Sequence, residues 1–305
     1  MLPNFPYILG RLWMKLQVGY SFSYLIYKLM VKIGFQKRIN GDNFAKSFKK
    51  KWLRKENDKS FFNFNGAILP DITEDVEKTN LLMVIFEDIF FISCFLNDNY
   101  EKSIVRRLDK YMPEGPYCYY DGDFNVTVKS KDIVIDAGAW VGDFSAYAAS
   151  KGASVYAFEP EQEIFNLLNK TAELNNGRIH PIQKGLGSKE CMVPFSINKN
   201  NSGASTLILN KNNVEKNMIP IITLDKFVKE NNINHIDFIK ADIEGAEREM
   251  IKGAVNTLKN FSPKLSICTY HLPDDPNVLE NLILEINPQY TIVHIRHKLF
   301  AAVIN

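Results

Sequence analysis

The pattern of apolar and polar positions changes along the chain, and its most regular part begins at Lys131. From there, short runs rich in β-branched residues alternate with longer stretches in which apolar residues recur at helical spacing. The predicted strands are 133–136, 154–158, 178–186, 236–242, 264–271 and two within 289–305, and the predicted helices are 143–151, 161–175, 224–231, 246–258 and 274–286. Alternating strands and helices specify a mainly parallel sheet with helices on both faces, which is an α/β fold.

The flanking segments carry different patterns. Residues 1–110 contain long apolar stretches with few β signals, and predict a mostly helical N-terminal region. Residues 111–130 alternate aromatic and β-branched residues around Asp121-Gly122, which predicts a β-hairpin leading into the next domain. Residues 190–222 hold short β segments joined by polar turns, and predict an inserted hairpin over one end of the sheet. We therefore expect a helical, basic region over 1–110 and an α/β domain over 111–305.

The composition is that of an ordinary globular protein, with 46% hydrophobic and 24% charged residues, and it excludes a disordered or low-complexity chain. The net charge of +2 conceals an uneven distribution, because residues 1–60 carry +10 and the remainder −8. The densest basic run, Lys49–Lys55, is typical of a solvated helix face. The alternative is contact with an acidic partner, such as a phosphate-bearing substrate, anionic lipid headgroups or RNA.

No segment has the composition of a membrane-spanning helix. The longest uncharged run within 1–36 is 16–27, which is shorter than the roughly 20 apolar residues that a span needs. The apolar run 81–96 carries Glu87 and Asp88, as suits a buried helix. The four cysteines form no Cys-x-x-Cys pair, which favours buried free thiols in a reducing compartment. We expect a cytoplasmic protein, with residues 1–60 as a candidate contact to a membrane surface or a phosphate group.

The first strand-turn-helix unit is the most informative segment. Asp136-Ala137-Gly138-Ala139-Trp140-Val141-Gly142 closes a predicted strand and opens a helix. Gly138 allows the backbone to approach a ligand where a Cβ would collide, and Gly142 allows the start of the helix to pack closely against the strand. The amides at such a helix start attract a carboxylate or a phosphate. The turn therefore predicts a ligand site beyond the carboxyl end of the first strand.

An acidic residue completes this pattern. Glu159 ends the second predicted strand, 23 residues after Asp136, where a carboxylate can bind two ribose hydroxyls. Both NAD and S-adenosylmethionine use this geometry. The spacing D-x-G-x-x-x-G lacks the middle glycine that brings backbone close to a pyrophosphate, so S-adenosylmethionine is favoured over NAD. A Rossmann oxidoreductase is the lesser alternative.

Further motifs follow in order, namely Gly185–Gly187, Ser202–Leu207, Thr223–Asp225 and Ile239–Glu247. With the two turns above, residues 115–305 resemble the FkbM family of S-adenosylmethionine-dependent methyltransferases, and Lys240–Glu247 is the most specific part of the resemblance. Tyr270–Asp274 and Ile295–His297 resemble a subgroup of this family. The resemblance implies a Rossmann-like, seven-stranded sheet with strand order 3-2-1-4-5-7-6, and O-methylation, often of sugars or other glycosylated molecules. Trp140 departs from the family, since many members carry Asn there.

The candidate cofactor residues lie at the carboxyl ends of the predicted strands. We expect Asp136, Gly138 and Gly142 to line the methionine end of the cofactor, and Glu159 to hold its ribose. Asp242, at the end of the fourth strand, is expected to face the reacting centre. Three residues after the third strand are expected to border the adenine, namely Lys184, Gly185 and Leu186. The residues beside the two turns complete the cofactor set, namely Ala139, Trp140 and Pro160.

The candidates for a general base are Asp242, Glu244 and His271, all at predicted carboxyl ends of neighbouring strands. His271 ranks first because a histidine has the pKa closest to neutrality, with a hydrogen-bonded histidine that ties down the 271–276 loop as the alternative. The same residues with Asp274 and Asp275 include metal-ligand types. However, carboxylates two residues apart at a strand end tend to point apart, and histidine favours softer metals, so we expect no metal site.

Three functions are compatible with these features. The first is a methyltransferase that acts on a saccharide hydroxyl. Its substrate would be a glycan precursor on a lipid or nucleotide carrier, and the basic residues 1–60 would contact that carrier. The second is an RNA methyltransferase that uses residues 1–60 as a basic arm, which is disfavoured because an Asn/Asp-Pro-Pro-aromatic motif is missing from the sequence. The third is a scaffold that binds the cofactor without catalysis. The sequence favours the saccharide methyltransferase.

Overall fold

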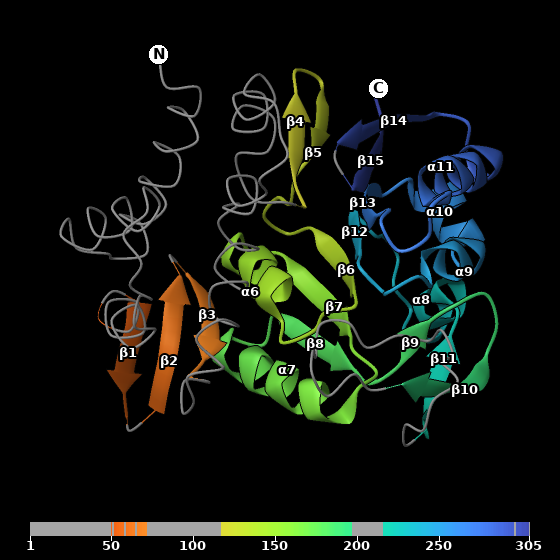
Figure 1. Cartoon of the computed structure of the whole chain (residues 1–305). Helices are drawn as coiled ribbons and strands as arrows, with labels where there is room; N and C mark the ends of the chain where they lie inside the picture. Colours follow the sequence, from red (N-terminus) through yellow and green to blue (C-terminus); the bar gives the residue numbers. More distant parts are fainter. Residues whose placement is uncertain are drawn as a thin grey trace, which may run out of the picture. The chain divides into compact units, whose positions relative to one another are not determined.

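The chain divides into two compact units, Met1–Pro116 and Tyr117–Asn305. The computed structural model describes residues 50–71 apart from 51, 58 and 65, together with 117–196, 216–295 and 297–304 (Figure 1). The expected helix over 81–96, the apolar stretch 1–36 and the centre of the 190–222 insertion lie outside the described residues. Among the residues that are described, no helix is long and apolar enough to cross a membrane.

The first unit contains a small antiparallel sheet where a helical region was expected. Strands β1 (Leu53–Glu56), β2 (Lys59–Phe64) and β3 (Ala67–Pro70) pair in sequence order. The prediction of helix is therefore wrong for residues 53–70. Positive φ angles of 46° at Asn57 and 102° at Gly66 mark the two tight turns. The stacked rings of Phe62 and Phe64 give the sheet its buried face, while the basic strand β1 is largely solvated, as expected for this charge run.

The second unit is built on a seven-stranded sheet in the order β8-β7-β6-β12-β13-β15-β14. When these seven strands are numbered 1 to 7 along the chain, their order is 3-2-1-4-5-7-6. This order confirms the predicted α/β, Rossmann-like sheet. Strand β15 is antiparallel to both β13 and β14, and all the other pairings in this sheet are parallel. The strands are β6 (Ile133–Ala137), β7 (Ser154–Phe158), β8 (Ile179–Ile182), β12 (Phe238–Ala241), β13 (Lys264–Cys268), β14 (Tyr290–Ile295) and β15 (Lys298–Val303).

Helices cover both faces of this sheet (Figure 1). On one face, the ring of Phe144 in α6 packs 5.8 Å from that of Phe238 in β12. On the other face, Phe227, Met250, Leu258 and Ile283 join the apolar side chains of the central strands in one buried cluster. The helices are α6 (Asp143–Ser150), α7 (Gln162–Leu174), α8 (Leu224–Glu230), α9 (Glu247–Lys252), α10 (Val255–Phe261) and α11 (Asp275–Ile286).

Two predicted elements are interrupted by tertiary contacts. The strand expected over 178–186 divides into β8 and β9 (Gly185–Leu186), because β9 leaves the main sheet to pair with β11 (Lys216–Ile222). Strand β10 (Cys191–Ser196) pairs with β11 on its other side. The helix expected over 246–258 divides at Gly253, where a Cβ would lie 2.0 Å from the carbonyl oxygen of Gly187. Close packing between the two segments therefore requires a glycine that also ends α9.

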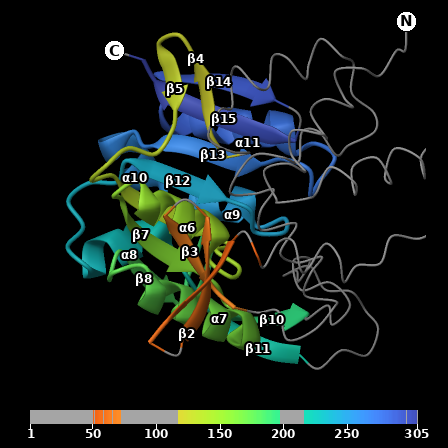
Figure 2. The same cartoon turned by 90° about the vertical axis from the view of Figure 1, so that its left-hand side faces the viewer.

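A hairpin precedes the first strand of the sheet. Strands β4 (Tyr119–Asp121) and β5 (Phe124–Val126) turn at Gly122, which has a φ of 62°. The hairpin lies beside β15 (Figure 2), and the Tyr119 ring stacks on Phe300 with centroids 5.4 Å apart. Of the described cysteines, Cys118 and Cys268 are buried and Cys191 is half-buried, and none of the three forms a disulfide.

A buried ion pair joins the two central strands. Asp136 of β6 and Lys240 of β12 are direct cross-strand partners, and their charged atoms lie 3.0 Å apart. Both side chains are almost completely buried, so neither charge is compensated by solvent. The Asp136 carboxylate also accepts a 2.6 Å hydrogen bond from Ser145 in α6. The pair therefore links the sheet to the helix that follows the glycine turn.

Lys240→Met should lower the free energy of unfolding by about 3–5 kcal/mol, because it leaves the Asp136 carboxylate buried without its counter-charge. Urea unfolding at pH 7 measures the loss. The double variant Asp136→Asn with Lys240→Met removes both charges and should be more stable than the single variant. A double variant no more stable than Lys240→Met would show that the pair is not the source of the effect.

Gly138→Ala should destabilise the protein more than Gly177→Ala does. Both glycines have left-handed backbones, with φ of 72° and 69°, so each substitution carries a similar backbone cost of about 1–2 kcal/mol. At Gly138 the added Cβ would lie 1.9 Å from the carbonyl oxygen of Asp242, whereas at Gly177 nothing lies within 4 Å. Urea unfolding should show a further loss of about 1–3 kcal/mol or more at Gly138. Equal losses would contradict the packing of this turn on β12.

Candidate active site

The glycine turn between β6 and α6 has an unusual backbone. Gly138, Trp140 and Gly142 all have positive φ, at 72°, 50° and 86°. The amides of Gly138 and Ala139 both donate to the carbonyl of Phe158, which fixes the turn to the end of β7. The left-handed φ of Trp140 gives a physical reason for the Asn that many FkbM members carry there, because Asn tolerates this conformation better than bulky residues do. Gly142 packs against Leu168 and Thr171 of α7 rather than against the strand.

Asp136 in β6 and Lys240 in β12 hold this turn in place from the two central strands. The Lys240 ammonium donates a 2.6 Å hydrogen bond to the carbonyl of Gly138, in addition to its ion pair with Asp136. Burial lowers the pKa of Lys240, but the surrounding aspartates outweigh burial and raise it above its usual value, so the ammonium stays charged. Asp136 is fully buried and its carboxylate is engaged by Lys240 and Ser145. In this structure Asp136 holds the turn in place instead of facing a ligand.

Glu159 follows β7 at the same edge of the sheet. Its buried carboxylate accepts hydrogen bonds from the amides of Trp140 and Glu161, at 3.1 and 2.9 Å. Burial raises the pKa of Glu159 to about 8, an effect that the two amide hydrogen bonds only partly offset. Pro160 follows directly and is half-buried. A ligand that donates hydroxyl groups to this carboxylate would relieve the unfavourable burial of its charge.

The turn also contains a polar group without a partner. The indole Nε1 of Trp140 is buried and makes no hydrogen bond. A buried donor of this kind costs free energy unless an acceptor satisfies it. The donor at Trp140 and the carboxylate at Glu159 fit a ligand that carries both an acceptor, such as a carboxylate, and a diol. S-adenosylmethionine has both groups.

The residues expected beside the adenine lie after β8. Lys184 is half-buried, and its amide donates to the carbonyl of Ile182 in a tight turn. Gly185 and Leu186 form β9 and are buried, and Leu186 belongs to the main apolar cluster. Of the three, Lys184 is the most accessible to a ligand. Gly185 and Leu186 are buried next to Lys184 and are therefore part of the protein interior.

A second group of polar residues meets at the ends of β12 and β13. The Asp242 carboxylate accepts a hydrogen bond from Tyr117 at 2.9 Å on Oδ2 and from Tyr270 at 3.0 Å on Oδ1. Burial raises the pKa of Asp242, but Lys240, Lys298, His271 and the Tyr117 hydroxyl outweigh this and lower it below its usual value. Asp242 is thus an ionised carboxylate at neutral pH, at the end of the central strand.

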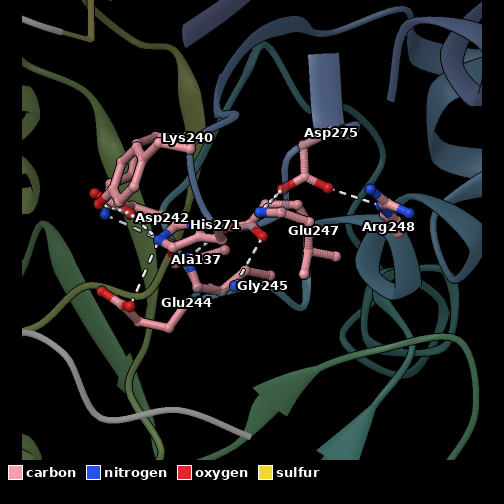
Figure 3. Close-up of polar contacts among 12 residues, drawn as sticks. Ala137, Lys240, Asp242, Glu244, Gly245, Glu247, Arg248, His271 and Asp275 are labelled. Carbon is pink, nitrogen blue, oxygen red and sulfur yellow. Dashed lines mark hydrogen bonds and ion pairs between the residues drawn. The ribbon is translucent and has the colours of Figure 1, made fainter. Parts of the chain in front are cut away.

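Asp242 and Glu244 converge on His271, contrary to the expectation that they point apart (Figure 3). The imidazole Nε2 lies 3.6 Å from Oδ1 of Asp242 and 3.5 Å from Oε2 of Glu244. The reason is the backbone at Glu244, which is left-handed with a φ of 54° and turns the chain back on itself. The alternation of side chains along a strand, on which the expectation rested, ends with β12 at Ala241.

The buried carboxylate of Glu247 stabilises this turn. It accepts hydrogen bonds from the amides of Ile243 and Gly245, at 2.9 and 3.0 Å, and its Oε1 lies 3.1 Å from Nδ1 of His271. Figure 3 also shows Asp275 and Arg248, and the guanidinium of Arg248 donates a 2.7 Å hydrogen bond to Asp275. Asp274 pairs with the same guanidinium, further from His271. His271 is therefore held between carboxylates on both sides of its ring.

This environment changes the ranking of the candidate bases. Burial lowers the pKa of His271, but Glu244, Glu247 and Asp242 outweigh it and raise the pKa to about 10. An imidazole with this pKa already carries its proton at neutral pH and has no lone pair to accept another. His271 therefore loses its first rank, and Asp242 is an ionised carboxylate that can accept a proton.

Four residues of the site went unassigned in the sequence. Lys240 could have been found, because a lysine between apolar residues in the middle of a predicted strand needs a buried counter-charge, and Asp136 is the only acid in the predicted strand 133–136. Glu247 opens a helix, where an acid is favourable without any role in a site, so its position alone does not indicate one. Tyr270 adjoins His271, but nothing in the sequence indicates that its hydroxyl reaches Asp242. Tyr117 lies 125 positions from Asp242, and only the fold brings them together.

The chain is similar in sequence to known methyltransferases. The chain is 28% identical over 154 residues to the hexuronic acid methyltransferase AglP of Haloferax volcanii, covering 50% of this chain and 62% of AglP. It is 27% identical over 157 residues to methyltransferase sdnD of Sordaria araneosa, covering 41% of this chain and 61% of that protein. The chain thus spans about three fifths of the length of these relatives.

A solved structure of methyltransferase FkbM from Methylobacillus flagellatus is 20% identical, with a TM-score of 0.46, and the match covers 93% of this chain and 71% of that one. The model of the methyltransferase FkbM domain matches residues 136–300, more than half of the chain, from the glycine turn to β15. This match confirms the resemblance seen in the sequence motifs. The chain belongs to the FkbM methyltransferase family.

Proposed function

We propose that this protein is an S-adenosylmethionine-dependent O-methyltransferase that acts on a saccharide hydroxyl. The observation that carries this proposal is the contact between the two halves of the site. Gly138 of the cofactor turn packs so tightly on the backbone of Asp242 that no side chain fits between them. A donor bound at the turn and an acceptor bound at Asp242 would therefore be neighbours, as an in-line transfer requires.

The cofactor side of the site would be formed by the two turns after β6 and β7. Glu159 would bind the ribose hydroxyls, and the indole of Trp140 would donate to the methionine carboxylate. Lys184 would border the adenine, with Gly138, Ala139 and Gly142 as the close backbone and Gly185 and Leu186 behind it. S-adenosylmethionine, when bound, supplies a methyl group on a sulfonium that is already activated for displacement.

The acceptor side would be formed by Asp242, Glu244 and His271. A new carbon–oxygen bond forms as the carbon–sulfur bond breaks, and the proton of the hydroxyl must pass to a nearby group. Asp242 is the ionised carboxylate at that point, and the hydroxyls of Tyr117 and Tyr270 hold it in place. The carboxylates also offer acceptors for the other hydroxyl groups of a sugar.

Two observations support a saccharide as the acceptor. AglP, at 28% identity, is a hexuronic acid methyltransferase. The ring of Tyr270 is 49% exposed beside Asp242 and is of the kind on which the apolar face of a sugar packs. The positive charge of residues 1–60 supports a carrier that bears phosphate, either a lipid or a nucleotide, and a cytoplasmic location at a membrane surface.

Cofactor affinity should rise with pH up to about pH 8. The pKa of Glu159 is about 8 in the free protein, and ribose hydroxyls donate to its ionised form. Below that pH, binding must displace the proton, so affinity should increase by up to about tenfold per pH unit between about pH 6 and 8 and then level off. Calorimetric titration with S-adenosylmethionine across this range measures it.

Glu159→Gln should bind the cofactor about tenfold or more weakly and should lose this pH dependence. Glu163→Gln, at an exposed position in the first turn of α7, is the matched control and should behave as the wild type. A wild-type affinity that does not change with pH, or a Glu159→Gln variant that retains the pH profile, would remove Glu159 from the site.

The acceptor class can be tested with radiolabelled S-adenosylmethionine and cell extract fractionated into lipid-linked glycan, nucleotide-sugar, RNA and protein pools. We expect label in a glycan or nucleotide-sugar pool. Asp242→Asn should reduce the transfer rate by about a hundredfold or more while cofactor affinity stays within about threefold. Asp274→Asn, which removes an exposed carboxylate outside the cluster, should retain the rate. Label in RNA alone would replace the saccharide as acceptor.

A further inference from the structure

The environment of His271 is unlike that of the other histidines. Its side chain is only 6% exposed, yet neither ring nitrogen makes a hydrogen bond, and Nε2 lies 3.5 and 3.6 Å from oxygens of Glu244 and Asp242. Two other histidine–carboxylate pairs in the described part of the chain, His294 with Glu280 and His235 with Asp237, close to 2.7 and 2.9 Å. The Nε2 of His271 is thus held near two carboxylates at a separation too long for a normal hydrogen bond.

These separations suit ligands of one metal ion. Oxygen and nitrogen ligands lie about 2.0–2.2 Å from a small divalent cation, and at angles of about 90–109° two of them are about 2.8–3.6 Å apart. One ligand atom from each of Asp242, Glu244 and His271 lies within 4.8 Å of the others. We propose that Asp242, Glu244 and His271 bind a divalent cation. Two carboxylates and one imidazole favour Mn²⁺, since carboxylates suit hard ions and imidazole suits later transition metals.

The residues around the three ligands support this assignment. Glu247 lies 3.1 Å from Nδ1 of His271 and is itself fixed by two main-chain amides. A cation at Nε2 would have to displace the proton that this nitrogen carries in the free chain, while the Glu247 carboxylate beside Nδ1 keeps the other proton there. Tyr117 and Tyr270 donate to the oxygens of Asp242 in the same outer-shell manner. The ligands are therefore oriented before any ion binds.

A second grouping, on the other side of the imidazole, is a weaker candidate. Glu247, His271 and Asp275 also lie close enough together to hold an ion. However, both oxygens of Glu247 accept main-chain amides, and Asp275 accepts from Arg248 and from the amide of Leu272. These carboxylates are already committed to protein donors. Glu247 and Asp275 therefore orient the residues of the site, and we place the ion on the Nε2 side of the imidazole.

The backbone at Glu244 is the final observation. A non-glycine residue with φ near 54° is energetically unfavourable, and such strain persists where the surrounding structure imposes it. Here the strain brings the Glu244 carboxylate beside that of Asp242, where the two like charges repel. A bound cation would turn that repulsion into attraction.

The role of the ion rests on the proposed function. With three protein ligands, Mn²⁺ retains open positions that two neighbouring hydroxyl oxygens of a saccharide can fill. The ion would lower the pKa of the bound hydroxyl, so that Asp242, which uses one oxygen as a ligand, could take the proton on its other oxygen as the methyl group arrives. It would also select acceptors with vicinal oxygens. The acceptor class is then a diol-bearing sugar.

Mn²⁺ binding to the full chain, treated beforehand with a chelator, tests the site directly. Electron paramagnetic resonance follows the loss of the free Mn²⁺ signal, and we expect one bound ion per chain. Glu244→Gln and His271→Ala should each weaken binding about tenfold or more. His294→Ala, which removes a surface histidine paired with Glu280, is the matched control and should bind as the wild type. Circular dichroism shows whether each variant is folded, and Glu244→Gln tests the site if His271→Ala is not.

The outcomes separate this inference from the proposed function. No Mn²⁺ binding by the wild-type chain, or binding that is unchanged in Glu244→Gln and His271→Ala, would overturn the metal site. Methyl transfer that proceeds equally after chelation would overturn its catalytic role. A chain that binds Mn²⁺ at these residues but neither binds S-adenosylmethionine nor methylates any pool would overturn the proposed function and leave the metal site in place.

Discussion

The buried ion pair between Asp136 and Lys240 is the interaction on which the rest of the site depends. It joins the two central strands at the point where both approach their carboxyl ends. From there the Lys240 ammonium reaches the carbonyl of Gly138, and the Asp136 carboxylate reaches Ser145 of α6. A charge in the middle of the sheet is costly unless every partner is in place. The pair therefore ties the correct pairing of β6 with β12 to the correct shape of the glycine turn.

The same geometry accounts for the division of the site. Two residues beyond Lys240, the chain leaves β12 at Asp242, whose backbone packs on Gly138. The residues on one side of this contact carry a buried carboxylate and an unsatisfied donor, which suit a ligand rich in hydroxyl and carboxylate groups. On the other side, acidic side chains surround a single imidazole. In the proposed function, the methyl donor and the acceptor would thus lie on either side of this one backbone contact.

The order of the main sheet and the glycine turn could be predicted because both depend on local sequence. Apolar strands alternate with amphipathic helices, and the family motifs fix the strand order. The β1–β3 sheet was missed although Asn65-Gly66 is a strong hairpin signal and the nearby phenylalanines favour strands, because the long apolar stretches of residues 1–110 favoured a helical interpretation throughout. The break at Gly253 depends on its approach to Gly187 from a distant segment. Likewise, the meeting of Asp242, Glu244 and His271 follows from one left-handed residue, a conformation that sequence patterns do not reveal.

The turn at Glu244 explains why Asp242, Glu244 and Glu247 occur within six residues of one another. A strand that simply ended at Asp242 would present one carboxylate to the site. The left-handed Glu244 adds a second, and its conformation is unfavourable unless the amides on either side are held. Glu247 holds the amides of Ile243 and Gly245, and it can do so only because it opens α9 with its side chain buried. The same carboxylate then fixes His271, so that one buried glutamate maintains both the strained turn and the orientation of the imidazole.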